Sequence, residues 1–248
     1  MVKALVALLA AGCGRVGFAE RTAGDAGAAS DATTASDADG DGAVATVALL
    51  AHTIENGQVA NLTTAPIDTT GASLIVVAEC TWATGAPKLP TDSAGNAWQS
   101  TQSFGANQAP ANFALFYALA PLTSTAHAFT NPGNDYLSIA VLAFSGLATF
   151  DTLVGGTGVV PFAPGAIVPS GPGEVLVSLA CSGDSVATSV VIDAGFMLVD
   201  ALLNTGGASS PEDMASAYVF ETSASSFSPH WTFTGDAKAT GALAAFGR

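Results

Sequence analysis

Few side chains in this sequence have the type and spacing that covalent or acid–base chemistry needs. The three histidines are His52, His127 and His230, and no two of them lie at a spacing typical of zinc ligands. The sequence also lacks the G-x-S-x-G pattern of an exposed serine nucleophile. The sequence therefore predicts no metal site, no cofactor and no catalytic residue, and we expect that the protein is not an enzyme.

Carboxylates could still form an acid–base pair, because the two members of such a pair come from distant parts of a chain and meet only in the fold. No feature of the sequence selects one pair from the four candidates Glu79, Asp92, Glu174 and Glu221. His127 and His230 each precede an F-T segment, as "HAFT" and "HWTFT". We expect these two histidines to occupy equivalent places in the fold and to have a structural role.

The three tryptophans are the largest apolar side chains, and exposed aromatic rings of this kind can stack on sugar rings. Trp82 and Trp231 belong to apolar segments, so we expect both to pack in a core. Trp98 follows the turn sequence "DSAGN", where its ring could pack inside or lie exposed beside Asp92 and Asn96. Trp98, Asp92 and Asn96 are therefore the candidate ligand-binding residues.

Cys80 and Cys181 lie in two similar apolar segments, "LIVVAECTW" and "VLVSLACS". Alternation along a strand places Cys80 on the same face as Leu74 and Val76, with Glu79 on the other face, and it places Cys181 on the apolar face of the second segment. Both thiols should thus face the core. Two outcomes stay open, a Cys80–Cys181 disulfide or two buried free thiols, because sequence does not supply the distance between them.

The third cysteine, Cys13, follows a short positive start and an apolar run that is too short to span a membrane. The stretch "LLAAGC" resembles the lipobox of bacterial lipoproteins, although Ala10 stands where leucine is usual in that family. The resemblance implies that residues 1–12 are a signal peptide and that Cys13 carries a lipid anchor after cleavage. Gly14 rather than aspartate follows the cysteine, which implies the outer membrane, on its periplasmic or extracellular face.

Residues 13–43 are rich in Asp, Ala and Gly, and the part from 21 to 42 contains no large apolar side chain. Such a segment cannot bury enough apolar surface to offset the entropy of ordering, so we expect a solvated linker. Asp37 to Val44 carries the first half of a calcium-loop pattern, but Ala48 stands where such a loop needs a bidentate Glu. We therefore assign it to the linker.

The net charge of −14, with six Lys and Arg in total, excludes a nucleic-acid partner, because phosphate binding depends on clustered basic side chains. The same shortage argues against electrostatic docking on anionic lipid. Any attachment to a membrane must therefore be covalent or hydrophobic.

From residue 44 to residue 248 the sequence is typical of strands, with short runs of Val, Ile, Thr, Phe and Tyr broken by turn residues. Two half-repeats, 74–146 and 174–247, share similar segments at similar spacing, and we expect the Gly- and Pro-rich Thr152 to Gly173 to be the loop that connects them. Neither half could cover its apolar face alone. The prediction is an all-β domain, a two-sheet β-sandwich of jelly-roll type with a weak internal duplication.

The segments "DSAGNAW", "LFYAL", "HAFT" and "LSIAVLAFSG" together resemble an uncharacterised, lectin-like β-sandwich domain of bacterial surface and phage structural proteins. The resemblance covers most of Thr64 to Arg248 and implies a fold without established catalytic residues. We expect a non-catalytic binding or adhesion module for glycans or other surface ligands. Two alternatives stay open, a structural component of a surface layer or assembly, and a carbohydrate-active hydrolase.

Overall fold

The computed structural model describes residues 46–82, 86–105, 111–133, 136–184, 186–204 and 211–248. The predicted signal peptide, the linker and the lipidation site Cys13 lie outside the described residues. All the described strands belong to one unit, Ala43–Arg248. The described residues contain strands and no helix, so the predicted all-β class is confirmed.

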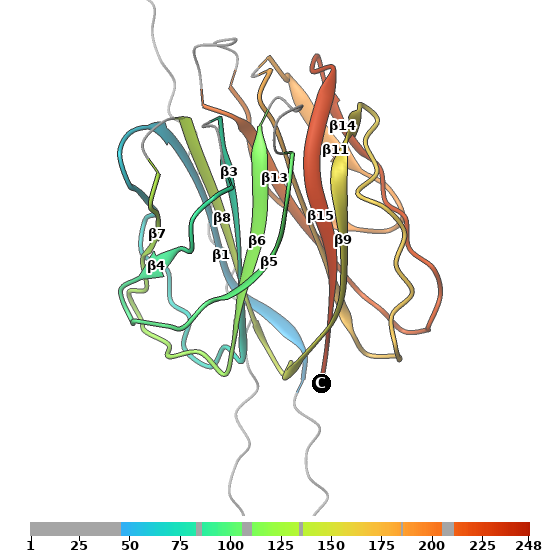
Figure 1. Ribbon diagram of the computed structural model, residues 1–248. Coiled ribbons are helices and arrows are strands. Elements are labelled where there is room, and N and C mark those ends of the chain that lie inside the picture. Colours follow the sequence, from blue (N-terminus) through green and yellow to red (C-terminus); the bar gives the residue numbers. More distant parts are fainter. Residues whose placement is uncertain (1–45, 83–85, 106–110, 134–135, 185, 205–210) are drawn as a thin grey trace, which may run out of the picture. The chain divides into compact units, whose positions relative to one another are not determined.

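The described residues form fifteen strands, and every pairing between these strands is antiparallel (Figure 1). Their bounds are β1 Ala48–Gln58, β2 Leu62–Thr63, β3 Leu74–Thr81, β4 Thr91–Asp92, β5 Gln99–Phe104, β6 Asn112–Leu119, β7 Phe129–Asn131, β8 Tyr136–Ser145, β9 Thr149–Val159, β10 Val175–Ser182, β11 Ser189–Ile192, β12 Met197–Leu202, β13 Asp213–Phe220, β14 Trp231–Thr234 and β15 Lys238–Gly247.

Two five-stranded sheets form the centre of the fold, with strand orders β1-β8-β3-β6-β5 and β9-β15-β10-β13-β12. The two orders match strand for strand, because β3 corresponds to β10, β6 to β13 and β8 to β15. Each sheet takes its strands from one side of the Ser145–Thr149 connection. The fold is sandwich-like with open-edged sheets, and this strand order does not confirm a jelly-roll topology.

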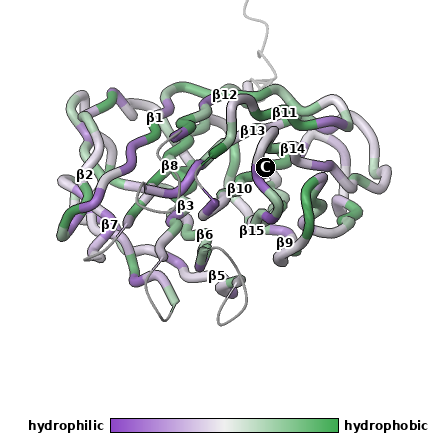
Figure 2. Tube along the Cα trace, turned by 90° about the horizontal axis from the view of Figure 1, so that it is seen from above, coloured by the Kyte–Doolittle hydropathy of each residue, from purple (hydrophilic) through white to green (hydrophobic). Residues whose placement is uncertain are grey.

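The continuous apolar runs of β3 and β10 are explained by burial on both faces. Residues of β3 and β10 that face each other, including Val76 and Val177, form the core between the two large sheets. Two small sheets cover the outer faces, β2-β7-β4 over the first large sheet and β11-β14 over the second. Figure 2 shows these four layers in sequence, from β2 and β7 at one side to β11 and β14 at the other.

The edges of the two large sheets meet along both sides of the core. On one side His52 of β1 contacts Asp200 of β12, with Nδ1 and Oδ2 at 2.8 Å. On the other, Gly155 of β9 packs so closely on the Phe104 ring that a Cβ atom there would lie 2.5 Å from it. The prediction of a loop from Thr152 to Gly173 was therefore wrong for the residues up to Val159, which belong to strand β9. Its glycines permit a close-packed edge strand, and they do not mark a turn there.

The sandwich has two distinct ends. We call the first the entry end, because β1 begins there at Ala48, beside the last residue of β8 and the end of β15 (Figure 1). We call the opposite one the loop end, where β3 ends at Thr81 and β10 ends at Ser182. Strands β5 and β12 also end at the loop end, and β6, β8 and β13 begin there.

Candidate functional site

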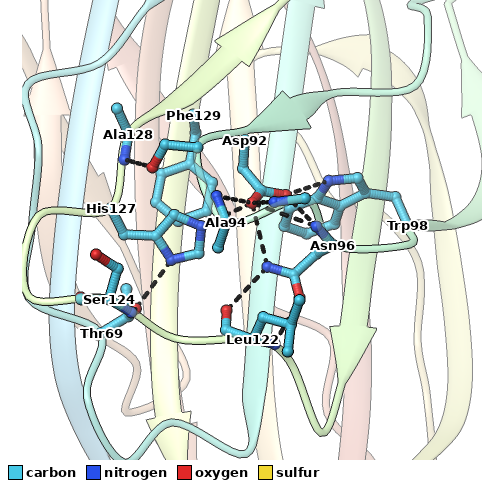
Figure 3. Close-up of polar contacts among 12 residues, drawn as sticks. Thr69, Asp92, Ala94, Asn96, Trp98, Leu122, Ser124, His127, Ala128 and Phe129 are labelled. Atoms are coloured by element: carbon cyan, nitrogen blue, oxygen red, sulfur yellow. Dashed lines mark hydrogen bonds and ion pairs between the residues drawn. The ribbon is translucent and has the colours of Figure 1, made fainter.

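The candidate residues Asp92, Asn96 and Trp98 do come together in the structure, on the turn that follows β4 (Figure 3). Asp92 ends β4, and its Oδ1 accepts hydrogen bonds from the backbone N–H groups of Ala94 and Gly95, both at 2.8 Å. Its Oδ2 accepts from Asn96 N at 3.1 Å and from Trp98 Nε1 at 3.0 Å. Gly95 has φ +81°, which favours glycine at this position of the turn.

His127 extends this cluster across the small sheet. Its Nε2 lies 2.9 Å from Asp92 Oδ1, and its Nδ1 lies 2.9 Å from the Thr69 hydroxyl. The same hydroxyl accepts a hydrogen bond from Ser124 N at 3.1 Å. We call Thr69, Asp92, Asn96, Trp98 and His127 the Asp92 network (Figure 3).

The charge on Asp92 is stabilised by its donors. Burial alone would raise the pKa of the carboxyl, but the hydrogen bond and charge of His127 and the N–H donors of Ala94 and Gly95 outweigh it, so the pKa lies below its ordinary value. Asp92 is thus an ionised acceptor whose hydrogen-bonding capacity is already used. Trp98 is half-buried, donates to Asp92 and packs edge-on against Phe129, with ring centroids 6.2 Å apart.

The order hydroxyl, imidazole, carboxylate in Thr69, His127 and Asp92 is also that of a catalytic triad. Here the side chains of His127 and Asp92 are 0 % exposed, and Thr69 is 0 % exposed as a residue. A hydroxyl enclosed in this way meets no substrate. The Asp92 network instead holds the β4 turn and β7 to the segment at Thr69, so its members bind one another.

The two histidines expected to be equivalent are not. His127 forms a β-bridge with Ile67, and the matching bridge in the second half joins Ile167 to Phe227. Phe227 therefore takes the place of His127, while His230 pairs with Asp193 at the surface, Nδ1 to Oδ2 at 3.1 Å. The similar segments "HAFT" and "HWTFT" suggest that His127 corresponds to His230. The β-bridges show instead that His127 corresponds to Phe227, three positions before His230.

Trp82 is the aromatic residue that the sequence interpretation misplaced. Trp231 is fully buried as expected, but Trp82 is 49 % exposed and lies just after β3 at the loop end. The strand ends at Thr81, so the alternation that holds for Cys80 no longer places the next side chain in a core. The turn-forming residue types that follow soon after Trp82 in the sequence could have indicated that the strand ends before it.

The sequence interpretation also missed a pair of carboxyls, Asp213 and Asp236, at the loop end. Asp213 begins β13, and Asp236 stands two residues before β15. Both strands pair with β10 in an antiparallel direction, so both aspartates arrive beside its Ser182 end. Burial and, to a smaller extent, the neighbouring Asp236 raise the pKa of Asp213 to about 7, against the opposing effect of the N–H donors of Asn204 and Ala187.

The remaining carboxylate candidates lie elsewhere. Glu79 is completely buried, neither of its side-chain oxygens has a hydrogen-bond partner among the residues that the structure describes, and burial raises its pKa well above the ordinary value. Glu174 and Glu221 are neighbours at the entry end, where Glu221 N donates to Glu174 O at 2.8 Å. They line a cavity of about 260 Å³ with Phe220 and Arg248.

Cys80 and Cys181 are joined in a disulfide, with Cα atoms 6.5 Å apart. Each cysteine occupies the same place in its half, on β3 and on β10, and the bond therefore links the central strands of the two large sheets across the core. The open choice between a disulfide and two thiols is thus decided for the disulfide in this structure.

Within the described ranges, no group of three or more His, Cys, Asp or Glu side chains is placed to hold a metal ion. The same part of the chain contains no helix that is long and apolar enough to cross a membrane. Comparison with known proteins gives no match to a family model, to a curated protein or to a solved structure.

Proposed function

We propose that the protein is a lipid-anchored cell-surface module that binds glycans or other surface ligands without catalysis. In this proposal Cys13 carries the anchor in the bacterial outer membrane, residues 13–43 act as the spacer, and the loop end of the sandwich is the binding surface. The lipobox-like "LLAAGC" and the lectin-like segments of the sequence motivate it.

The observation that carries the proposal is that the two ends of the sandwich differ. The described chain begins at the entry end, where Thr46 precedes β1, whereas Trp82 directly follows the loop end of β3, beside the first residues of β6 and β8. Loops placed on a rigid sandwich are the usual site of ligand binding. An anchor upstream of Thr46 would therefore leave the loop end free to meet a ligand.

Trp82 supplies the chemistry that such a surface needs. Its indole is 49 % exposed, and its backbone is fixed because Trp82 N donates to Tyr136 O at 3.3 Å. A large aromatic ring on a fixed backbone can stack on a sugar face at a low cost in conformational entropy.

The buried disulfide supports the proposed location. Disulfides persist in oxidising compartments such as the periplasm and the cell surface, and they are rare in the cytosol. The matching strand orders of the two large sheets support the internal duplication as the origin of the domain.

The location is tested by fractionating cells that express the full chain or its Cys13→Ser variant. The proposal predicts that the parent protein is in the outer-membrane fraction and that the variant is lost from it. Equal membrane fractions for both proteins would contradict the anchor.

The binding function is tested with the full chain, solubilised in detergent, on an array of bacterial and plant polysaccharides. We expect saturable binding to at least one polysaccharide class, with no release of product. Release of soluble sugar would favour the hydrolase alternative. Absence of binding, combined with self-assembly into layers, would favour the structural alternative.

A further inference from the structure

Asp213 and Asp236 are two buried carboxyls at the loop end that accept hydrogen bonds from the consecutive backbone amides of Ala187 and Val186, which places them close together. Asp213 is 0 % exposed and Asp236 is 7 % exposed. The Oδ2 atom of Asp236 is buried and receives no N–H or O–H donor from the described residues. A buried carboxylate oxygen without a donor is costly, and a proton held between the two side chains removes that cost.

The remaining oxygens of the pair bind backbone groups of the loop end. Asp236 Oδ1 accepts from Val186 N at 3.1 Å, and Asp213 Oδ2 accepts from Ala187 N at 3.1 Å. Asp213 Oδ1 accepts from Asn204 N, just after β12 ends. The pair thus fixes the start of the β10–β11 connection and the start of the β12–β13 connection at one point.

Other charged groups stand on the elements that pack here. Asp184, after β10, accepts from Ala237 N at 2.8 Å, and Lys238 begins β15 with its side chain exposed. Glu212 adjoins Asp213, and its backbone oxygen accepts hydrogen bonds from Asn56 and Ser138 of the first sheet. Glu55 precedes Asn56 on β1, and its side chain points to the opposite face. The local charge is therefore mainly negative, which favours retention of one proton by the pair.

We propose that Asp213 and Asp236 share one proton and form a pH-sensitive latch on the loop end. With the proton in place, the pair is singly charged and holds Val186, Ala187 and Asn204. When the proton leaves, two buried negative charges repel each other. Any local opening that separates and hydrates them then becomes more favourable.

The pH range follows from the cause of the shift. The pKa of Asp213 is about 7 in the folded protein, above its value in an opened segment, because of burial and the neighbouring Asp236. A group with a raised folded pKa stabilises the closed form at low pH, and that stabilisation is lost as the pH rises toward 7. The latch is therefore closed in mild acid and loosened above neutral pH.

The latch would regulate the surface that is proposed to bind a ligand, so its biological role rests on the proposed function. Its test does not use a ligand. If the array shows no binding at any pH while the latch behaves as described, only the binding function fails. If binding is found and the latch does not respond to pH, only the latch fails.

The three amides bound by the pair are direct reporters of the latch. Amide exchange of Val186, Ala187 and Asn204 in the full chain is measured from pH 5 to pH 8.5 and corrected for intrinsic exchange rates. We expect protection of all three to fall at least tenfold across this range. The amides of Ala94 and Gly95, which are bound to Asp92, should keep theirs.

Two variants separate the latch from general destabilisation. Asp236→Asn keeps a side chain of the same shape without the charge or the shared proton, and it should weaken the pH dependence at the three reporters, leaving only the part that burial of Asp213 causes. Asp151→Asn is the matched control, because Asp151 Oδ2 also accepts a backbone N–H, from Ser170 at 2.9 Å. It should leave the pH dependence unchanged.

A carboxyl-carbon NMR titration of the parent chain tests the same proposal without any variant. One carboxyl of the pair should titrate near neutral pH. Protection that does not change with pH at the reporters, a transition that is the same in Asp236→Asn as in the parent, or two carboxyls that both titrate at ordinary values would each overturn the latch.

Discussion

The two halves of the sandwich share a strand order but cover their outer faces by different means. Over the first large sheet, the small sheet β2-β7-β4 carries the charged Asp92 network around His127. Over the second, Phe227 takes the place of His127, and the cover consists of apolar side chains such as Trp231 and Phe233. The comparison teaches that one topology accepts either cover, provided the buried polar groups of that cover find partners, as His127 and Asp92 do.

A contrast in the same direction is found in the centres of the two sheets. Glu79 of β3 lies next to Cys80, and its counterpart beside Cys181 on β10 is Ala180. The first half thus buries an unpartnered carboxyl where the second buries a methyl group. The halves also differ in how they respond to pH, because Asp92 has a lowered pKa and Asp213 a raised one.

The largest expected effect on stability comes from removing the disulfide that joins the two halves. The Cys80→Ala/Cys181→Ala double variant opens a covalent loop with a sequence separation of 101 residues. Loop-closure entropy predicts a loss of about 4 to 5 kcal/mol in the free energy of unfolding. Urea denaturation of the double variant and of the parent protein measures it. An unchanged midpoint would show that the disulfide does not stabilise the joined halves.

Removing the acceptor at the centre of the first cover should cost almost as much. Asp92→Ala leaves the donors of His127 and Trp98 buried without a partner, which costs about 3 to 5 kcal/mol. The matched control in the second half is Asp193→Ala. The side chain of Asp193 is 58 % exposed, and the change should cost less than about 1 kcal/mol. Equal losses in the two variants would contradict the difference between the covers.

Converting one cover toward the other gives a smaller effect. His127→Phe introduces the residue of the second half, but it removes a donor from Asp92 and a partner from Thr69. We expect a loss of about 1 to 3 kcal/mol, because two buried polar groups lose a hydrogen bond. A thermal denaturation series checks the direction. A variant as stable as the parent would mean that the Asp92 network contributes no net stability.

Glu79 should give the first half a dependence on pH that its counterpart lacks. Because burial raises its pKa, the folded protein binds a proton that the unfolded chain has released, so stability falls as the pH rises above the ordinary value of the carboxyl. Glu79→Gln should therefore show a smaller decrease than the parent between pH 4.5 and pH 7.5 in chemical denaturation. The contribution of Asp213 is common to both proteins and cancels in the difference. Identical decreases would contradict this assignment.

Much of the fold could be predicted because the pattern of apolar residues indicates which segments form strands and which faces of them are buried. Cys80 and Cys181 lie in alternating apolar segments, so their inward direction followed from the strand period. The position of Thr149–Val159 could not be predicted, because its glycines serve a close contact with Phe104 that depends on another strand. His127 and His230 could not be assigned either, because bridge register is a property of the folded pair.

The candidate site was predicted only in part. The turn sequence "DSAGN" brings Asp92, Asn96 and Trp98 together by local hydrogen bonds, which a sequence pattern can indicate. That Asp92 would be saturated by His127 depends on β7, far away in the chain. Likewise, the exposure of Trp82 and the meeting of Asp213 with Asp236 arise from where antiparallel strands end together.

The central claim is that the loop end, and not the entry end, is the binding surface. Its most direct test compares two variants of the full chain on the polysaccharide array. Trp82→Ala removes the exposed ring at the loop end, and Leu122→Ala removes an apolar side chain, 61 % exposed, that follows the entry end of β6. The account predicts at least tenfold weaker binding for Trp82→Ala and unchanged binding for Leu122→Ala. Unchanged binding for Trp82→Ala, or a loss confined to Leu122→Ala, would contradict it.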